Sequence, residues 1–230
     1  MSLKNKVAVL TGSTGATAIN IAQMLLKEGA IVVVPAKSAR DLLWIKQIED
    51  VAGKGTIITL LANYPDFYRA KEIADDIIER FGKIDLSIAC FEGSAVARPL
   101  SQVEITDWEH TMEQNITAFF VAARLSFSSM KTSRHGMFIS IDFTAQTIKG
   151  TDVKLARLSQ CMQREMAKMF CEEVKGTNIK YYHLYVDAGK RNNKVEDNYI
   201  HPDELGALIV DLYKGNITGT QALFEWMHDK

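Results

Sequence analysis

The chain has 230 residues, of which 47% are hydrophobic and 24% are charged, a composition typical of a globular protein that can bury one large core. Because 27 basic residues are balanced by 28 acidic ones, no net field attracts phosphate backbones or anionic lipid, and nucleic acid is not expected as a partner. The apolar runs are too short for a bilayer span or a signal peptide, which predicts a cytoplasmic protein with no membrane partner.

Short β-branched runs alternate with helical segments along the whole chain, and most of these runs are apolar on both faces, as in a parallel sheet covered by helices. This alternation predicts one domain, residues 1–230, of the α/β class: a three-layer αβα, doubly wound parallel sheet of about seven strands, the Rossmann fold. The expected strands are Val7–Thr11, Ile31–Pro35, Thr56–Leu61, Ile84–Cys90, Met137–Ile141, Ile179–Val186 and Gln221–Trp226. The expected helices are Thr17–Glu28, Ala39–Val51, Phe67–Phe81, Asp107–Lys131, Val153–Val174 and Pro202–Tyr213.

The turn after the first expected strand consists of small residues, and in a doubly wound fold ligands bind at such a turn. It reads Thr-Gly-Ser-Thr-Gly-Ala-Thr-Ala over residues 11–18. Small residues let backbone amides approach a pyrophosphate at a helix N-terminus, whose dipole favours negative charge. The turn therefore predicts a dinucleotide site that contains Gly12, Ser13, Thr14 and Gly15, although a tight structural connection uses the same residue types.

Further motifs follow one another along almost the full length of the chain. They are Lys-Glu-Gly-Ala at 27–30, Arg-Phe-Gly-Lys-Ile-Asp at 80–85, His-Pro-Asp-Glu-Leu at 201–205 and Asn-Ile-Thr-Gly at 216–219. With Thr11-Gly12 and with Asn115 in the long central helix, they give the chain a resemblance to the short-chain dehydrogenase/reductase family. The resemblance implies the Rossmann fold, a nicotinamide dinucleotide and subunits that pair through their long helices.

The segment after the second expected strand indicates which dinucleotide the chain prefers. Family members that bind NAD place an aspartate there on the ribose hydroxyls, whereas those that bind NADP offer a basic residue to the extra phosphate. Residues 35–40 contain no acid, and Lys37, Ser38 and Arg40 suit a 2′-phosphate. We therefore expect NADP rather than NAD, with Asn63 as a further cofactor-binding residue, although Ser38 could simply cap a solvated helix.

Two departures from the family pattern predict that NADP binds more weakly than in a typical member. The second and third glycines of the family's first turn fall on Ala16 and Ala18, which narrows the approach to the backbone. The family's Asn-Asn-Ala-Gly segment after the fourth strand falls on residues 89–92. Phe91 and Glu92 there would crowd and charge the cofactor path.

The catalytic motif of the family departs further. Family enzymes use a tyrosine with a lysine four residues later as the acid/base pair, and a serine about thirteen residues before the tyrosine. None of the seven tyrosines has a lysine four positions on. Aligning the last expected long helix places Asp152 at the tyrosine site and Ala156 at the lysine site, while Asp142-Phe143 replaces the serine pair. We therefore expect little of the family's ordinary turnover.

The remaining candidates for catalysis are Asn115, Asp142, Asp152 and Lys154, with His183 nearby by alignment. Asn115 would hold a water or kink its helix, although it could equally bond to its own helix backbone. An aspartate is an effective acid at neutral pH only if burial raises its pKa. The simpler expectation for these aspartates is therefore a surface or capping role.

Two functions remain open on this basis. The first is a binding or interaction protein with weak or vestigial NADP binding, whose partners are the dinucleotide and an unidentified small molecule. The alternative is an NADP-dependent oxidoreductase with nonstandard catalytic residues. The apolar surface of the two long helices predicts a homodimer or homotetramer in either case. Three widely spaced cysteines fit neither a disulfide framework nor a metal site.

Overall fold

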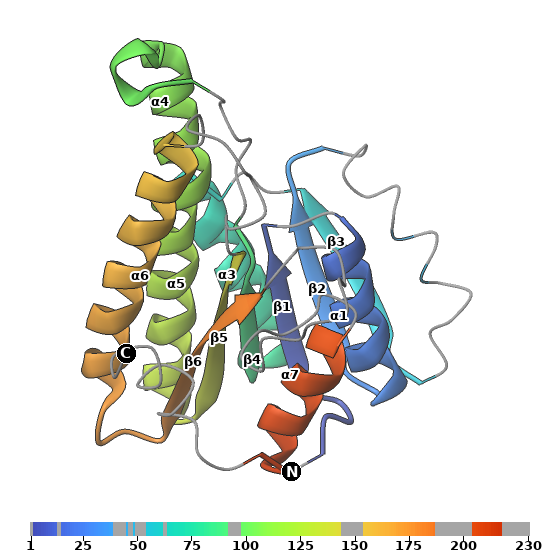
Figure 1. The fold of residues 1–230 in the computed structure, drawn as a ribbon. Coiled ribbons are helices and arrows are strands. Elements are labelled where there is room, and N and C mark those ends of the chain that lie inside the picture. The colour runs from blue at the N-terminus through green and yellow to red at the C-terminus, as the bar shows by residue number, and fades with distance from the viewer. Residues whose placement is uncertain are drawn as a thin grey trace, which may run out of the picture.

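The computed structural model describes residues 2–12, 15–38, 45, 48, 54–61, 64–91, 98–143, 154–186 and 204–217. In this part of the chain six parallel strands form one sheet in the order β3-β2-β1-β4-β5-β6 (Figure 1). The order reverses between β1 and β4, which makes the carboxyl ends of these strands a topological switch point, where doubly wound folds bind ligands. The strands are β1 (Val7–Thr11), β2 (Ile31–Ala36), β3 (Thr56–Leu61), β4 (Leu86–Ala89), β5 (Gly136–Phe143) and β6 (Ile179–Val186).

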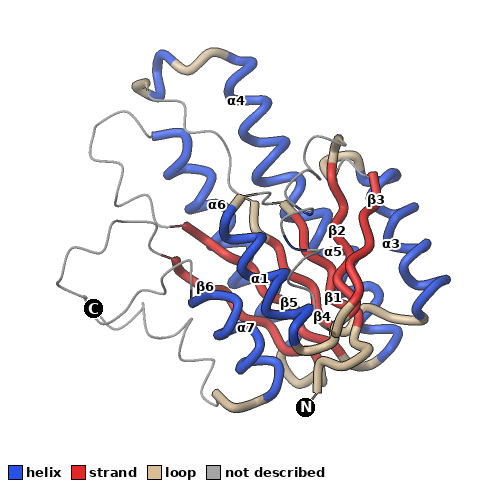
Figure 2. The backbone as a smooth tube through the Cα atoms, turned by 90° about the vertical axis from the view of Figure 1, so that its right-hand side faces the viewer, coloured by secondary structure: helices blue, strands red, loops and turns tan. Residues whose placement is uncertain are grey.

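Helices cover both faces of the sheet, as Figures 1 and 2 show. One apolar core joins the sheet to α1 (Ala16–Lys27) and α7 (Leu205–Lys214). A second core joins the opposite face to α3 (Phe67–Phe81), α5 (Ala118–Ser133) and α6 (Lys154–Val174). The expected three-layer αβα architecture is therefore confirmed, because strands that are buried on both faces need a helical layer on each side.

The expected long helix at residues 107–131 is interrupted in the structure. It begins as α4 (Ile105–Thr111), passes through the π-helical turn η3 (Met112–Thr117) and continues as α5. A π-helical turn adds a residue to the helical repeat and often occurs at a functional site. Figure 1 shows α4 at the upper end of α5, beyond the sheet.

The other element bounds differ little from the sequence expectation. β1, β3 and β6 have the expected ends, whereas β5 is longer because it pairs with β6 up to Phe143 and Val186. The expected strand Gln221–Trp226 lies outside the described residues, and so does the expected helix Ala39–Val51 apart from Ile45 and Ile48, which are buried. No helix in the described ranges combines the length and the apolar character that crossing a membrane requires.

A buried carboxylate fixes β1 and β4 at their amino ends. Asp85 accepts hydrogen bonds from the backbone N–H of Val7 at 3.1 Å and from the ammonium groups of Lys6 at 3.2 Å and Lys83 at 3.0 Å. Burial by itself would raise the pKa of Asp85, but the Val7 amide and the two lysines together lower it. The carboxylate is therefore a structural anchor at the edge of the sheet opposite the switch point.

Candidate active site

The turn after β1 packs directly against the end of β4. Gly12 has a φ of +98°, and a Cβ atom built on it would lie 2.3 Å from the carbonyl oxygen of Cys90 and 2.9 Å from Cδ1 of Phe91. The backbone N–H of Cys90 donates to the Thr11 carbonyl at 2.9 Å, and the Thr11 hydroxyl donates to the Ile88 carbonyl at 3.1 Å. Only glycine fits this close approach, which brings the first turn to the switch point.

The N-terminus of α1 suits an anion. Gly15 is the N-cap residue, and the first turn of α1, which the structure describes throughout, contains no acidic residue. The positive end of the helix dipole is therefore not compensated by a carboxylate of that turn. Ala18, at a family glycine position, is fully buried in the core shared with α7. The other two residues predicted for this turn, Ser13 and Thr14, lie outside the described residues.

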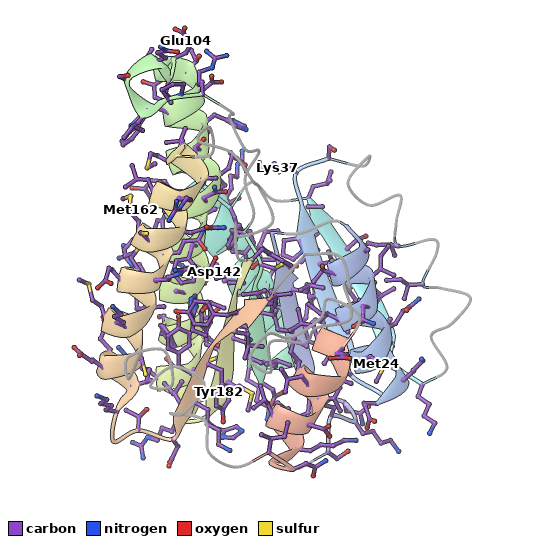
Figure 3. The ribbon with its side chains drawn as sticks, viewed as in Figure 1. Met24, Lys37, Glu104, Asp142, Met162 and Tyr182 are labelled. Atoms are coloured by element: carbon purple, nitrogen blue, oxygen red, sulfur yellow. The ribbon has the colours of Figure 1, made fainter. Side chains whose placement is uncertain are left out.

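The predicted phosphate partners follow β2. Lys37 and Ser38 are exposed at the carboxyl end of that strand, and Figure 3 shows Lys37 and Asp142 at this same edge of the sheet. The exposed Lys37 ammonium can therefore reach a ligand that lies across the strand ends. Arg40 and Asn63, which the sequence analysis added to this group, are not among the described residues.

Phe91 lies beside the first turn, as the sequence analysis expected for a residue on the cofactor path. It is half-buried, its ring centroid is 6.2 Å from that of Tyr64, and its carbonyl accepts a hydrogen bond of 3.3 Å from Nε2 of Gln163. Phe91 is therefore held by contacts from the end of β3 and from α6. Glu92, its predicted neighbour on the path, falls outside the described ranges.

Asn115 lies in η3 and is 5% exposed. Its Nδ2 donates to Oγ of Ser159 on α6 at 3.3 Å, and its backbone carbonyl accepts from Nε2 of Gln163 at 3.3 Å. Its side-chain oxygen Oδ1 is buried without a hydrogen-bond partner in the described part of the chain. The side chain thus reaches across to α6, and the interpretation that it bonds to its own helix is wrong for the described contacts.

A network of polar side chains lies between the ends of β5 and β6 and helix α6. Ser140 and His183 are cross-strand partners, with Oγ 2.6 Å from Nδ1, and Ser140 Oγ is also 2.8 Å from the Tyr181 hydroxyl. Oδ2 of Asp142 lies 4.0 Å from Nε2 of His183 and 2.5 Å from Nε of Arg164. We call these five side chains the polar ladder.

Burial changes the chemistry of the ladder. Asp142 is 2% exposed, so the expectation of a surface or capping role is wrong for this residue. Burial raises the pKa of its carboxyl group, and the neighbouring Arg164 guanidinium offsets part of that effect. Burial and the positive charge of Arg164 lower the pKa of His183 to about 3, which keeps the imidazole neutral. The raised pKa extends to higher pH the range in which the Asp142 carboxyl group holds a proton that it can donate.

The ladder contains the residue types of a nucleophilic triad but does not present a nucleophile. The Ser140 hydroxyl is held by both Tyr181 and His183, and Oδ2 of Asp142 lies 4.0 Å from Nε2 of His183, which is too far for the hydrogen bond that orients the base of a triad. A serine nucleophile must reach a substrate carbonyl. Ser140 is therefore a structural partner within the ladder.

The last two predicted catalytic residues are not placed with the others. Asp152 lies outside the described residues, and of Lys154 the structure describes the backbone at the start of α6 but not the side chain. The described residues contain no cluster of three or more histidine, cysteine, aspartate or glutamate side chains suited to a metal ion.

The contribution of α6 to the site was not predicted from the sequence. One buried stripe of this helix, with a spacing of four residues, contains Leu155, Ser159, Gln163 and Ala167. Two polar residues in the middle of an otherwise apolar stripe are the signal that could have identified Ser159 and Gln163. Arg164 has no comparable signal, because its role depends on how close α6 comes to the end of β5.

The chain is similar in sequence to bacterial reductases. The chain is 21% identical over 183 residues to a 3-oxoacyl-(acyl-carrier-protein) reductase of Thermotoga maritima. The aligned region covers 78% of the chain and 72% of that protein. The chain is 25% identical over 150 residues to the corresponding reductase of Escherichia coli, which covers 64% of the chain and 59% of that protein. The match thus spans only about three fifths of the length of the E. coli protein.

Solved structures share the fold. An NADH-dependent reductase complexed with NAD superposes with a TM-score of 0.75 at 19% identity, covering 94% of this chain and 93% of that one. An alcohol dehydrogenase from Thermococcus sibiricus, complexed with 5-hydroxy-NADP, also has a TM-score of 0.75 at 19% identity, with coverage of 92% and 91%. The family model for short chain dehydrogenases matches residues 6–186. The chain therefore belongs to the short-chain dehydrogenase family.

Proposed function

We propose that the protein is an NADP-dependent oxidoreductase that handles the substrate proton with residues other than the family's usual serine, tyrosine and lysine. The observation that carries this proposal is the buried carboxyl group of Asp142, which lies at the end of β5 beside Arg164 with a raised pKa. The family relatives with similar sequences are named reductases and dehydrogenases. The first of the two functions considered from the sequence, a binding protein with a vestigial site, gains no support from these relatives.

The described residues fit a dinucleotide at the carboxyl ends of β1, β2 and β4. Gly12 supports this fit because its lack of a side chain allows the tight turn, and the start of α1 offers a positive dipole to a pyrophosphate. Lys37 would pair with a 2′-phosphate. The bound cofactor would supply or accept the hydride. Phe91 narrows the path beside Gly12, so we expect weaker NADP binding than in a typical relative.

The role of the chain's own residues is to position the substrate and to move the proton. When a carbonyl is reduced, a hydride adds to its carbon and a proton must add to its oxygen. Asp142 would donate that proton from its carboxyl group and regain one from solvent. Asn115 has no proton to give near neutral pH, so its role would be to orient a group that bonds to its buried Oδ1.

The cofactor assignment is tested by calorimetric titration of the purified chain with NADP and with NAD. We expect NADP to bind more tightly, and Lys37→Ala to weaken NADP binding about tenfold with little effect on NAD. Lys54→Ala is the matched control, since Lys54 is also exposed but precedes β3 and so lies at the amino edge of the sheet. Tighter binding of NAD would overturn the preference, and unchanged NADP binding in Lys37→Ala would remove this residue from the site.

The catalytic assignment is tested with a panel of ketones, enones and alcohols in the presence of NADPH or NADP. We expect Asp142→Asn to lower kcat by roughly 10²–10⁴-fold, the usual contribution of a general acid. Asp75→Asn, at an exposed site on α3, should leave kcat unchanged. Asp152→Asn and Lys154→Ala show whether those residues contribute. If NADP does not bind and no substrate reacts above background, the binding-protein alternative replaces this proposal.

A further inference from the structure

The guanidinium of Arg164 contacts the carboxylate of Asp142 and the ring of Tyr185. Its Nε donates to Oδ2 of Asp142 at 2.5 Å, and its central carbon lies 5.1 Å from the centroid of the Tyr185 ring. The side chain is 28% exposed. Within the described part of the chain, Nε is the only nitrogen of this group with a hydrogen-bond partner. Among the described residues neither Nη group has a hydrogen-bond partner, so both can act as donors at the end of β5, because an arginine carries five N–H bonds in a planar fork.

These donors are suited to the oxygens of an anion, either a carboxylate or a phosphate. A planar fork of N–H groups matches the two oxygens of a carboxylate, and such charge-assisted pairs are stronger than neutral hydrogen bonds. A second carboxylate beside Asp142 is unfavourable while both are ionised, because like charges in one site raise the pKa of at least one of them. An anion that binds to the Nη groups of Arg164 would therefore favour protonation of Asp142, which is bonded to Nε.

We propose that the Nη groups of Arg164 bind a carboxylate of the substrate, and that Asp142 takes up a proton when this anion binds. The inference rests on the proposed function, which places the active site at the carboxyl ends of the strands. It names the substrate class as carbonyl compounds that carry a carboxylate, the oxo acids. It also explains how the acid is protonated. The substrate carboxylate neutralises the Arg164 charge that stabilises ionised Asp142. Asp142 then binds a proton from solvent and can donate it to the carbonyl oxygen.

The groups around Asp142 and Arg164 indicate that the proton taken up binds to Asp142. From β6, His183 and Tyr185 face the carboxyl group, and from α6 Cys161 interacts electrostatically with Arg164. Burial and Arg164 hold the pKa of His183 at about 3, so the imidazole does not take the proton near neutral pH. Burial raises the pKa of Tyr185 to about 12, so the phenol stays neutral. Asp142 is thus the group next to Arg164 whose charge changes with the bound anion.

The experiment uses two ligands of the same shape. Levulinate carries a ketone and a carboxylate, and methyl isoamyl ketone replaces that carboxylate with an uncharged isopropyl group. The full chain is titrated with each by calorimetry, with and without saturating NADP, in two buffers of different ionisation enthalpy at neutral pH. We expect levulinate to bind at least about tenfold more tightly. Its apparent enthalpy should depend on the buffer as proton uptake requires, and its affinity should fall as the pH rises.

Variants separate the two parts of the proposal. Arg164→Gln should abolish the preference for levulinate, and Arg164→Lys, which keeps the charge next to Asp142 but loses the fork, should reduce it. Arg157→Gln removes an exposed arginine of the same helix and should change nothing. Asp142→Asn should bind levulinate at least as tightly as the natural chain, but without proton uptake. Equal binding of the two ligands, or an unchanged preference in Arg164→Gln, overturns the carboxylate site, and absence of proton uptake in the natural chain overturns the coupling.

The same titrations distinguish this inference from the proposed function. If NADP binds and neutral ketones are reduced, but levulinate is not preferred, the carboxylate site is wrong and the oxidoreductase assignment remains. If levulinate is preferred through Arg164 but NADP does not bind, the anion site remains and the oxidoreductase assignment is wrong.

Discussion

Replacing Gly12 with alanine should destabilise the fold and weaken the cofactor site together. The new Cβ would lie 2.3 Å from the carbonyl oxygen of Cys90 and 2.7 Å from its carbon, so backbone rather than a flexible side chain has to move. The positive φ costs an alanine about 1–2 kcal/mol, and crowding in a packed region costs about 1–3 kcal/mol. We expect a total of roughly 2–5 kcal/mol, which for a chain of this size lowers Tm by roughly 5–15 °C.

Gly82→Ala is the matched control for this prediction. Gly82 ends α3 with a φ of +79° and has nothing within 4 Å of a built Cβ, so the change carries the conformational cost without the collision. Urea unfolding should show Gly12→Ala to be less stable than Gly82→Ala by about 1–3 kcal/mol. Calorimetry should show a loss of NADP affinity only in Gly12→Ala. Equal stability of the two variants would refute the reasoning, because it would mean that the turn does not press on the end of β4.

Three further outcomes test the anchor, the ladder and the assembly. Asp85→Asn should lower the free energy of unfolding by roughly 2–4 kcal/mol at neutral pH. Because the folded pKa of Asp85 is lowered, its contribution should be present above about pH 4 and lost below it. Urea unfolding should therefore show that the stability of the variant depends less on pH in the acid range. Burial holds the folded pKa of His183 at about 3, so the unfolded chain takes up a proton first, and the free energy of unfolding should fall by up to about 1.4 kcal/mol per pH unit below about pH 6.5. His183→Gln should remove that slope, and an unchanged slope in this variant would contradict the assignment. Met169 is 62% exposed on α6, where we expect two copies of the chain to pair. Light scattering should show a dimer or tetramer for the natural chain and a monomer for Met169→Asp. A natural chain that is already monomeric contradicts the pairing. Figure 3 shows Met162 on the same helix.

The architecture and the turn after the first strand as a ligand site could be predicted from the sequence, whereas the strand order came from the structure. The strands are apolar on both faces, and this pattern requires a helical layer on each side of a parallel sheet. The bounds of β1, β3 and β6 agree with the sequence prediction to the residue, although β3 lies at the edge of the sheet and stays partly exposed. Gly12 could also be identified as a turn residue, since the small residues around it indicate a close backbone approach. These features depend on local composition and periodicity, which a sequence contains in full.

The chemistry of the site depends on contacts that form only when the chain folds. The sequence indicated Asp142 as a candidate, yet its pKa is raised only because the fold buries it, and Arg164, 22 positions later and 2.5 Å away, offsets part of that rise. The same holds for Asn115, which lies in the π-helical turn and bonds to Ser159 on α6. A pKa depends on desolvation and on charges that are close in space. Neither quantity is determined by residue spacing along the chain, because distant segments come into contact only when the sheet and its helices pack.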